Sequence, residues 1–65
     1  MTPKQYLVAL HAAGIPDGLP VMEIDRRAAL LLEIAEHTAR KYRCGYVRVP
    51  GPVMVALAAL AEKAT

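Results

Sequence analysis

The chain has 65 residues, of which 55% are hydrophobic, and carries a formal net charge of +2. A chain of this length holds one domain, spanning residues 1–65, and a domain this small buries only about 60% of the surface that its unfolded chain exposes. Its single cysteine, Cys44, excludes an internal disulfide, and its longest apolar run, Val53 to Ala61, is too short for a membrane-spanning helix. We therefore expect a cytoplasmic domain with no signal peptide and no membrane partner.

The positive charges are concentrated in one stretch of the chain. Six of the eight Lys and Arg residues fall between Arg26 and Arg48, whereas residues 1–25 carry one base and three acids. Binding to the phosphate backbone of a nucleic acid requires such a local concentration of positive charge. On charge alone, the solvated face of an ordinary helix is the simpler explanation.

The first predicted helix covers residues 3–13. Thr2 and Gln5 have the spacing of a capping box, and Pro3 stands in the first turn, where its missing N–H has no cost. Gly14 provides the left-handed residue that ends a helix, and Ile15 provides the apolar contact after it. Residues 15–20 then form a turn rich in proline, aspartate and glycine.

The following segment has two interpretations. Residues 21–24 form either a short extended piece or the first turn of a helix entered through Pro20, and Asp25 is the better N-cap. No proline or glycine interrupts residues 26–43. Periodicity alone therefore predicts one long helix that ends near Gly45.

The last predicted helix covers residues 53–63, after a rigid turn over residues 50–52 that places Pro52 in the first helical position. It is apolar on nearly all sides, so it must be buried in the domain or at a subunit interface. In so short a chain we assign part of it to a homodimer interface. The assigned residues are Val53, Met54, Leu57, Leu60 and Ala61.

Residues 25–44 also fit the spacing of a helix-turn-helix, which competes with the single long helix. That motif needs a small residue where its helices cross, an apolar residue in the turn, and two inward residues on the second helix. These residues are Ala29, Ile34, Ala39 and Tyr42. The outward residues of the second helix are then Glu36, His37, Arg40 and Lys41. Their mixture of donors and acceptors suits the major groove of DNA.

Residues 25–42, DRRAALLLEIAEHTARKY, resemble the helix-turn-helix of small phage-type regulators, and residues 49–57, VPGPVMVAL, resemble the turn and helix that follow it. The resemblance is to the anti-CRISPR-associated (Aca) repressors in particular, which share the Arg-Arg-Ala-Ala run, and it covers about residues 25–60 together with residues 6–15. It implies an all-α bundle of four to five short helices and a homodimer joined through the C-terminal helix. It also implies repression at an inverted repeat in double-stranded promoter DNA, usually that of the regulator's own phage or mobile-element operon, such as an anti-CRISPR operon.

The resemblance also assigns roles by position. Arg26 and Arg27 would contact phosphates, while His37, Arg40 and Lys41 would face the groove. The full set of DNA-binding residues is Arg26, Arg27, Glu36, His37, Thr38, Arg40, Lys41 and Arg43. Glu33 stands at the turn position that usually holds glycine, so a left-handed glutamate is expected there at a cost of roughly 1–2 kcal/mol.

No pattern of catalytic residues is visible, so we expect no enzyme activity, cofactor or small-molecule substrate. The soft ligands His11, His37 and Cys44 lack metal-ligand spacing, and Cys44 is expected to be a small buried group. The competing function is a small helical protein-interaction module, such as a phage-encoded inhibitor that binds a host protein. It rests on the apolar last helix and on an unbroken helix over residues 25–43. A bend at residues 33–35 discriminates between the two hypotheses.

Overall fold

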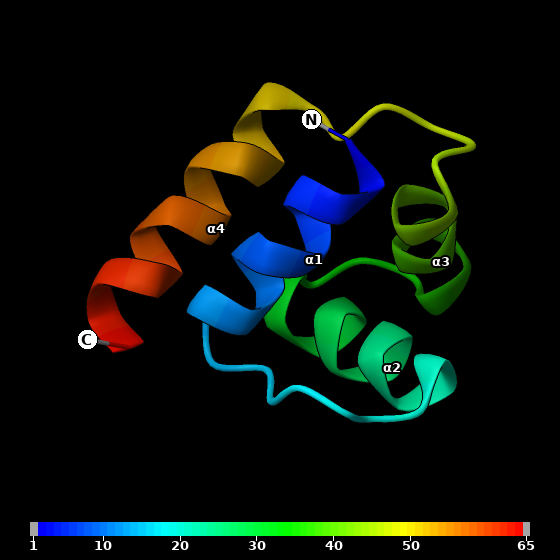
Figure 1. Ribbon diagram of the computed structural model, residues 1–65. Coiled ribbons are helices and arrows are strands. Elements are labelled where there is room, and N and C mark those ends of the chain that lie inside the picture. Colours follow the sequence, from blue (N-terminus) through cyan, green and yellow to red (C-terminus); the bar gives the residue numbers. More distant parts are fainter. Residues whose placement is uncertain (1, 65) are drawn as a thin grey trace.

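The computed structural model describes residues 2–64, which form four helices and no strand. The helices are α1 (Pro3–Ala12), α2 (Val21–Leu32), α3 (Glu36–Cys44) and α4 (Gly51–Ala64). They form a compact bundle with extents of 29 × 25 × 20 Å. In Figure 1, α1 lies in the middle, with α4 on one side and with α2 and α3 on the other. The expected all-α class with four to five helices is confirmed for this part of the chain.

α1 begins and ends through local interactions. Thr2 Oγ1 accepts a hydrogen bond from Gln5 N–H at 3.1 Å, and Gln5 Oε1 accepts one from Thr2 N–H at 2.9 Å, which completes the capping box. At the other end, Gly14 has a φ of 111°, and Ile15 N–H donates to the carbonyl of Leu10 at 3.0 Å. Ile15 is thereby buried against the end of the helix.

α2 begins at Val21, directly after Pro20, which has φ −56° and ψ 147°. The carbonyl of Pro20 accepts the N–H of Ile24 at 3.1 Å, so the helix is entered through the proline. Asp25 lies inside the helix and is buried, and its carboxylate pairs with Arg43, 18 residues later. The prediction of Asp25 as N-cap is wrong because this carboxylate binds a distant guanidinium instead of the backbone of its own helix.

The chain bends between α2 and α3, so the single long helix over residues 26–43 does not form. Glu33 has φ 56° and ψ 44°, the left-handed conformation expected for it, and Ile34 N–H donates to the carbonyl of Ala29 at 3.0 Å. Ile34 packs against the core. The bend brings the start of α3 beside α2, and the burial that it permits offsets the left-handed glutamate.

The core lies where the four helices meet. α1 contributes Tyr6 and Leu10 to it, both of which are fully buried. The rings of Tyr6 and Tyr42 meet edge to face, with centroids 5.9 Å apart and an interplanar angle of 72°, a favoured arrangement for aromatic pairs. The buried core residues are Tyr6, Leu10, Ile15, Ile24, Ala28, Ala29, Ala39, Tyr42, Val49 and Leu57. Residues from all four helices thus share one core.

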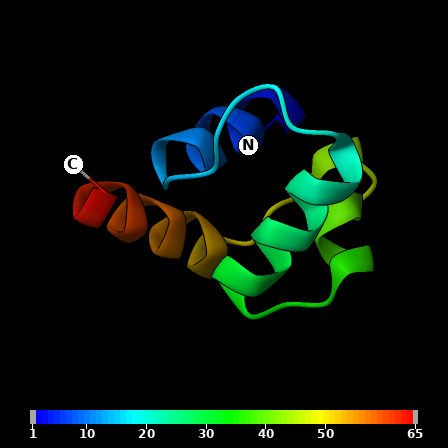
Figure 2. The same ribbon diagram turned by 90° about the horizontal axis from the view of Figure 1, so that it is seen from below.

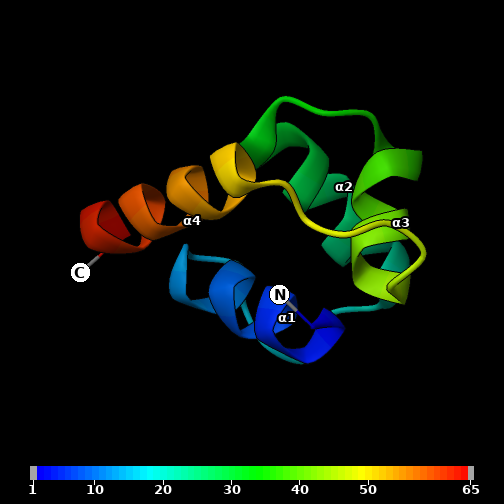
Figure 3. The same cartoon turned by 90° about the horizontal axis from the view of Figure 1, so that it is seen from above.

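α4 begins at Gly51, two residues earlier than predicted, and packs mainly against α1. Figures 2 and 3 show it running beside α1, with its C-terminal end directed away from α3. Leu57 is only 1% exposed and belongs to the core. Its assignment to a dimer interface is therefore wrong, because the same apolar stripe that suits a partner subunit is already covered by α1.

The other residues assigned to the interface are more accessible. Met54 is 37% exposed, whereas Val53, Leu60 and Ala61 are half-buried. The neighbouring Val55, which was not assigned, is 69% exposed. The accessible apolar surface of α4 is thus centred on Met54 and Val55.

Candidate functional site

α2 and α3 pack against each other, and each of them buries an alanine in the core. Ala29 of α2 is 7% exposed and Ala39 of α3 is fully buried. Side chains that end at Cβ let two helices pack with their backbones close together. With Ile34 and Tyr42 also directed toward the core, the four positions predicted to face inward do so. α3 is consequently held with its opposite face toward solvent.

A buried ion pair joins the same two helices. Arg43 Nε donates to Asp25 Oδ1 at 2.8 Å, and Arg43 Nη2 donates to Asp25 Oδ2 at 3.1 Å. The side chains of Arg43 and Asp25 are 18% and 11% exposed. The hydrogen bonds to Asp25 raise the pKa of Arg43 above its ordinary value. Arg43 was expected among the DNA contacts, but its guanidinium points inward, where it ties the end of α3 to α2.

The phenol of Tyr6 lies beside this ion pair. Its hydroxyl is buried and has no hydrogen-bond partner among the described residues. Burial, followed by the negative charge of Asp25, raises the pKa of Tyr6 to about 12. The ring of Tyr6 packs against the ring of Tyr42 on α3. Its hydroxyl adds no stabilising hydrogen bond within the described residues.

The outer face of α3 carries the residues predicted to read DNA. Glu36, His37, Arg40 and Lys41 are all exposed, and Thr38 is half-buried. Together with the first turns of α2, the start of α3 lines a surface hollow of about 320 Å³. The lining residues are Met22, Glu23, Asp25, Arg26, Glu36, His37 and Arg40. Carboxylate, imidazole and guanidinium groups from two different helices thus line the same hollow.

Ion pairs divide the cations of this face into two groups. Arg26 approaches Glu23 at 3.8 Å and Glu36 at 3.7 Å, and Arg27 approaches Glu23 at 3.2 Å. Both arginines are therefore partly neutralised within the chain. On α3 and in the loop that joins it to α4, Arg40, Lys41 and Arg48 have no ion pair with any of residues 2–64. The strongest free positive charge accordingly lies on α3 and on the loop after it.

Two exposed residues around this face were not predicted from the sequence. Met22 is 80% exposed and lines the hollow, and Tyr46 is 76% exposed in the loop that follows α3. The position of Met22 depended on the start of α2, which the sequence left open between residues 21 and 25. Tyr46 stands in a segment too short to show any periodicity.

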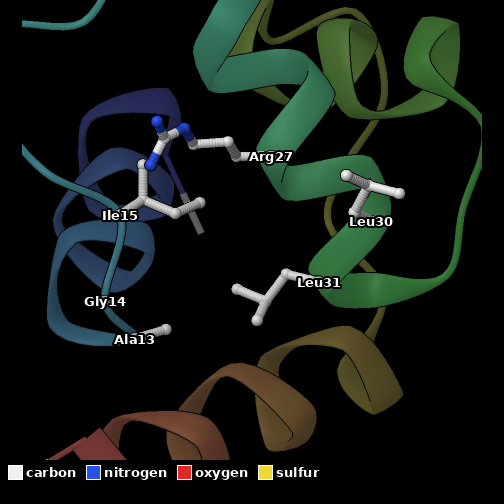
Figure 4. Close-up of a pocket in the computed structure, with 6 residues that line it drawn as sticks. All are labelled: Ala13, Gly14, Ile15, Arg27, Leu30 and Leu31. Carbon is white, nitrogen blue, oxygen red and sulfur yellow. The ribbon is translucent and has the colours of Figure 1, made fainter.

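A second, apolar hollow of about 340 Å³ lies between the end of α1 and α2. It is lined by Ala13, Gly14, Ile15, Arg27, Leu30 and Leu31. In Figure 4, Leu31 points from α2 toward the end of α1, whereas Leu30 points to the other side of α2. Leu30 is 76% exposed. This hollow has no carboxylate, hydroxyl or imidazole in its lining, so it offers little chemistry.

Residues 2–64 contain no group of three or more His, Cys, Asp or Glu side chains with the geometry to hold a metal ion. Cys44, which was predicted to be buried, is exposed at the end of α3. Within the same residues, each helix is too short or too polar to span a bilayer.

Comparisons with protein-family models, with curated proteins and with solved structures find no match to this chain. Functional inference therefore rests on the residues and their arrangement.

Proposed function

We propose that the chain is a sequence-specific DNA-binding transcriptional repressor that acts as a homodimer on an inverted repeat in a promoter. In this proposal α2, the turn at residues 33–35 and α3 form a helix-turn-helix, and α3 is the helix that enters the major groove. Consistent with the resemblance of residues 25–60 to phage-type regulators, the regulated promoter is that of its own phage or mobile-element operon, such as an anti-CRISPR operon.

The bend at Glu33 is the observation that carries the proposal. One long helix over residues 26–43 would have left no recognition helix. The chain instead forms two helices that pack against each other, with Ala29 and Ala39 buried, and the second presents a polar, exposed face. A nine-residue helix held on one side and exposed on the other is what a major groove about 12 Å wide accommodates.

Different residues of α3 are proposed to contact the bases and the phosphates. His37 and Arg40, which line the hollow, are donors suited to the N7 and O6 acceptors of guanine, and Glu36 is an acceptor suited to the amino group of cytosine. Lys41, one turn after His37, is suited to a phosphate. Arg26 is a weaker phosphate ligand, because it already approaches Glu23 and Glu36. Arg43 has no place among the contacts, since its guanidinium is held by Asp25.

The homodimer is proposed to form through α4. Met54 and Val55 leave apolar surface exposed there, with Leu60 and Ala61 half-buried beside them. Figure 3 shows α4 and α3 at opposite sides of the molecule. Two copies joined at α4 would therefore leave both α3 helices free. Bound in successive major grooves, these helices are separated by one turn of DNA, roughly 34 Å.

The competing function, a helical module that binds a host protein, has less support than the sequence suggested. It rested on the apolar last helix and on an unbroken helix over residues 25–43, and the second of these does not form. What remains is the exposed apolar surface at Met54 and Val55, which a second copy of the chain covers equally well.

The decisive experiment is a gel-shift titration of the purified protein with its own upstream promoter DNA and with a scrambled duplex, over a series of salt concentrations. The promoter should bind far more tightly than the scrambled duplex, with an affinity that falls steeply as salt rises. His37→Ala and Arg40→Ala should each weaken promoter binding about tenfold or more, because each removes a base contact.

Lys63→Ala is the matched control, since it removes a positive charge from the last turn of α4, far from α3. It should leave both affinities unchanged. Equal and weak binding of the two duplexes would overturn the proposal and favour a protein partner.

A further inference from the structure

We propose that the loop after α3 is a second DNA-contact element, in which Tyr46 and Arg48 bind the sugar–phosphate backbone. This inference rests on the proposed function and adds to it a contact that is independent of base sequence. The element is defined as residues 46–48, which follow Gly45 and precede the buried Val49.

The loop is held firmly at both ends. At its start, Gly45 has a φ of 81°, and Tyr46 N–H donates to the carbonyl of Lys41 at 3.0 Å, which ties the loop to the last turn of α3. Gly45 also packs closely on α1, because a Cβ there would lie 2.9 Å from Cγ of Pro3. At its end, Val49 is 2% exposed and belongs to the core.

Between these anchors the side chains point outward. Tyr46 is 76% exposed and Val47 is 45% exposed, and Arg48 is also exposed. Arg48 forms no ion pair with any of the described residues, in contrast to Arg26, Arg27 and Arg43. The fold itself therefore makes no use of the Tyr46 ring or of the Arg48 charge. A phenol and a guanidinium are both donors to phosphate oxygens.

The length of α3 places this loop at the edge of the groove. Its nine residues span roughly 14 Å at 1.5 Å per residue, whereas the major groove is about 12 Å wide. When the N-terminal residues of α3 reach the bases, its C-terminal end therefore emerges at a phosphate strand. Lys41 and the loop tied to its carbonyl lie at that end. Tyr46 and Arg48 consequently meet backbone rather than bases.

The test compares variants of the full chain in the salt series with promoter and scrambled duplexes. Arg48→Ala should weaken binding of both duplexes by a similar factor. It should reduce the slope of log affinity against log salt by about 1.8, because each of the two protomers loses one phosphate contact and each contact contributes about 0.9. Tyr46→Phe keeps the ring and loses the hydroxyl. It should weaken both affinities about threefold to tenfold and leave the slope unchanged, since no charge is removed.

Two controls separate this contact from other effects. Arg48→Lys should retain the salt slope, because an ammonium also neutralises a phosphate, and Lys63→Ala should leave slope and affinity unchanged. An unchanged slope in Arg48→Ala, with tight binding by the wild-type chain, would overturn the loop contact and leave the repressor proposal intact. A loss confined to the promoter duplex would also overturn it, because Arg48 would then read bases. Weak, non-selective binding by the wild-type chain would instead refute the proposed function, and this inference with it.

Discussion

The α3 side and the α4 side of the molecule are held to the centre by different forces. α3 is attached through its packing on α2, in which Ala29 and Ala39 are buried, and through the hydrogen-bonded pair of Asp25 and Arg43. α4 is attached mainly by burial of Leu57 against α1. Hydrogen bonds are directional, whereas apolar burial is not. The orientation of α3 is therefore specified more narrowly than that of α4, as a surface for positioned polar contacts requires.

The largest effect is expected on the α4 side. Leu57→Ala should lower the free energy of unfolding by about 3–4 kcal/mol, because it removes a fully buried side chain and leaves a cavity. Val55→Ala, two positions earlier on the exposed face, should change it by less than about 0.5 kcal/mol. Urea unfolding of both variants measures the difference.

Self-association of the same two variants, measured over a series of protein concentrations, extends this comparison. If Leu57→Ala kept the monomer fully stable and only abolished self-association, Leu57 would face a partner subunit and the account of α4 would fail. Val55→Ala is instead the variant expected to weaken the proposed dimer.

An intermediate effect is expected on the α3 side. Asp25→Ala should lower the free energy of unfolding by about 2–3 kcal/mol, because it leaves Arg43 largely buried without its partner. It should also weaken promoter binding, since the end of α3 loses its link to α2. Asp17→Ala is the control: its carboxylate is 87% exposed in its pair with His11, and such pairs contribute less than about 1 kcal/mol. Equal unfolding curves for the two variants would show that the pair does not anchor α3.

The smallest effect concerns Tyr6, where the two sides meet. Tyr6→Phe should raise the free energy of unfolding by about 1 kcal/mol at pH 7, because it removes a buried hydroxyl that has no partner among the described residues. Unfolding by urea at pH 7 measures this difference. A loss of stability would show that the hydroxyl is hydrogen-bonded in solution.

The same substitution has a pH signature. The pKa of Tyr6 is raised from 10.0 to about 12, so the unfolded chain loses this proton first. The stability associated with the neutral phenol is complete below pH 10 and is lost as pH rises toward 12. Tyr6→Phe should remove that part of the alkaline loss, and unfolding measured between pH 9 and 12 checks it.

The ends of α1 illustrate what local sequence suffices to predict. Thr2, Gln5 and Gly14 act on backbone groups within a few residues of themselves, and each behaves as predicted. The residues that face inward between α2 and α3 were also predictable, because the spacing of small and apolar residues reflects the geometry of two packed helices. They are Ala29, Ile34, Ala39 and Tyr42.

Asp25 and Leu57 illustrate what local sequence does not predict. A buried aspartate after a proline-rich turn has the pattern of an N-cap, and only the position of Arg43, 18 residues away, reveals its partner. Likewise, an apolar stripe on a short helix has the same pattern whether α1 or a second subunit covers it. Exposure of Met22 and Tyr46 depended on where α2 begins and on how residues 45–49 are anchored.

The sequence by itself determined the all-α class, the capped first helix and the residues that face inward at the α2–α3 crossing, because periodicity and capping act over one or two helical turns. Only the tertiary structure decided between one helix and two over residues 26–43. The left-handed Glu33 is unfavourable locally, and the burial of Ile34 and Ala39, together with the Asp25–Arg43 pair, outweighs it. Those contacts join residues that are distant in the chain, so no local pattern contains them.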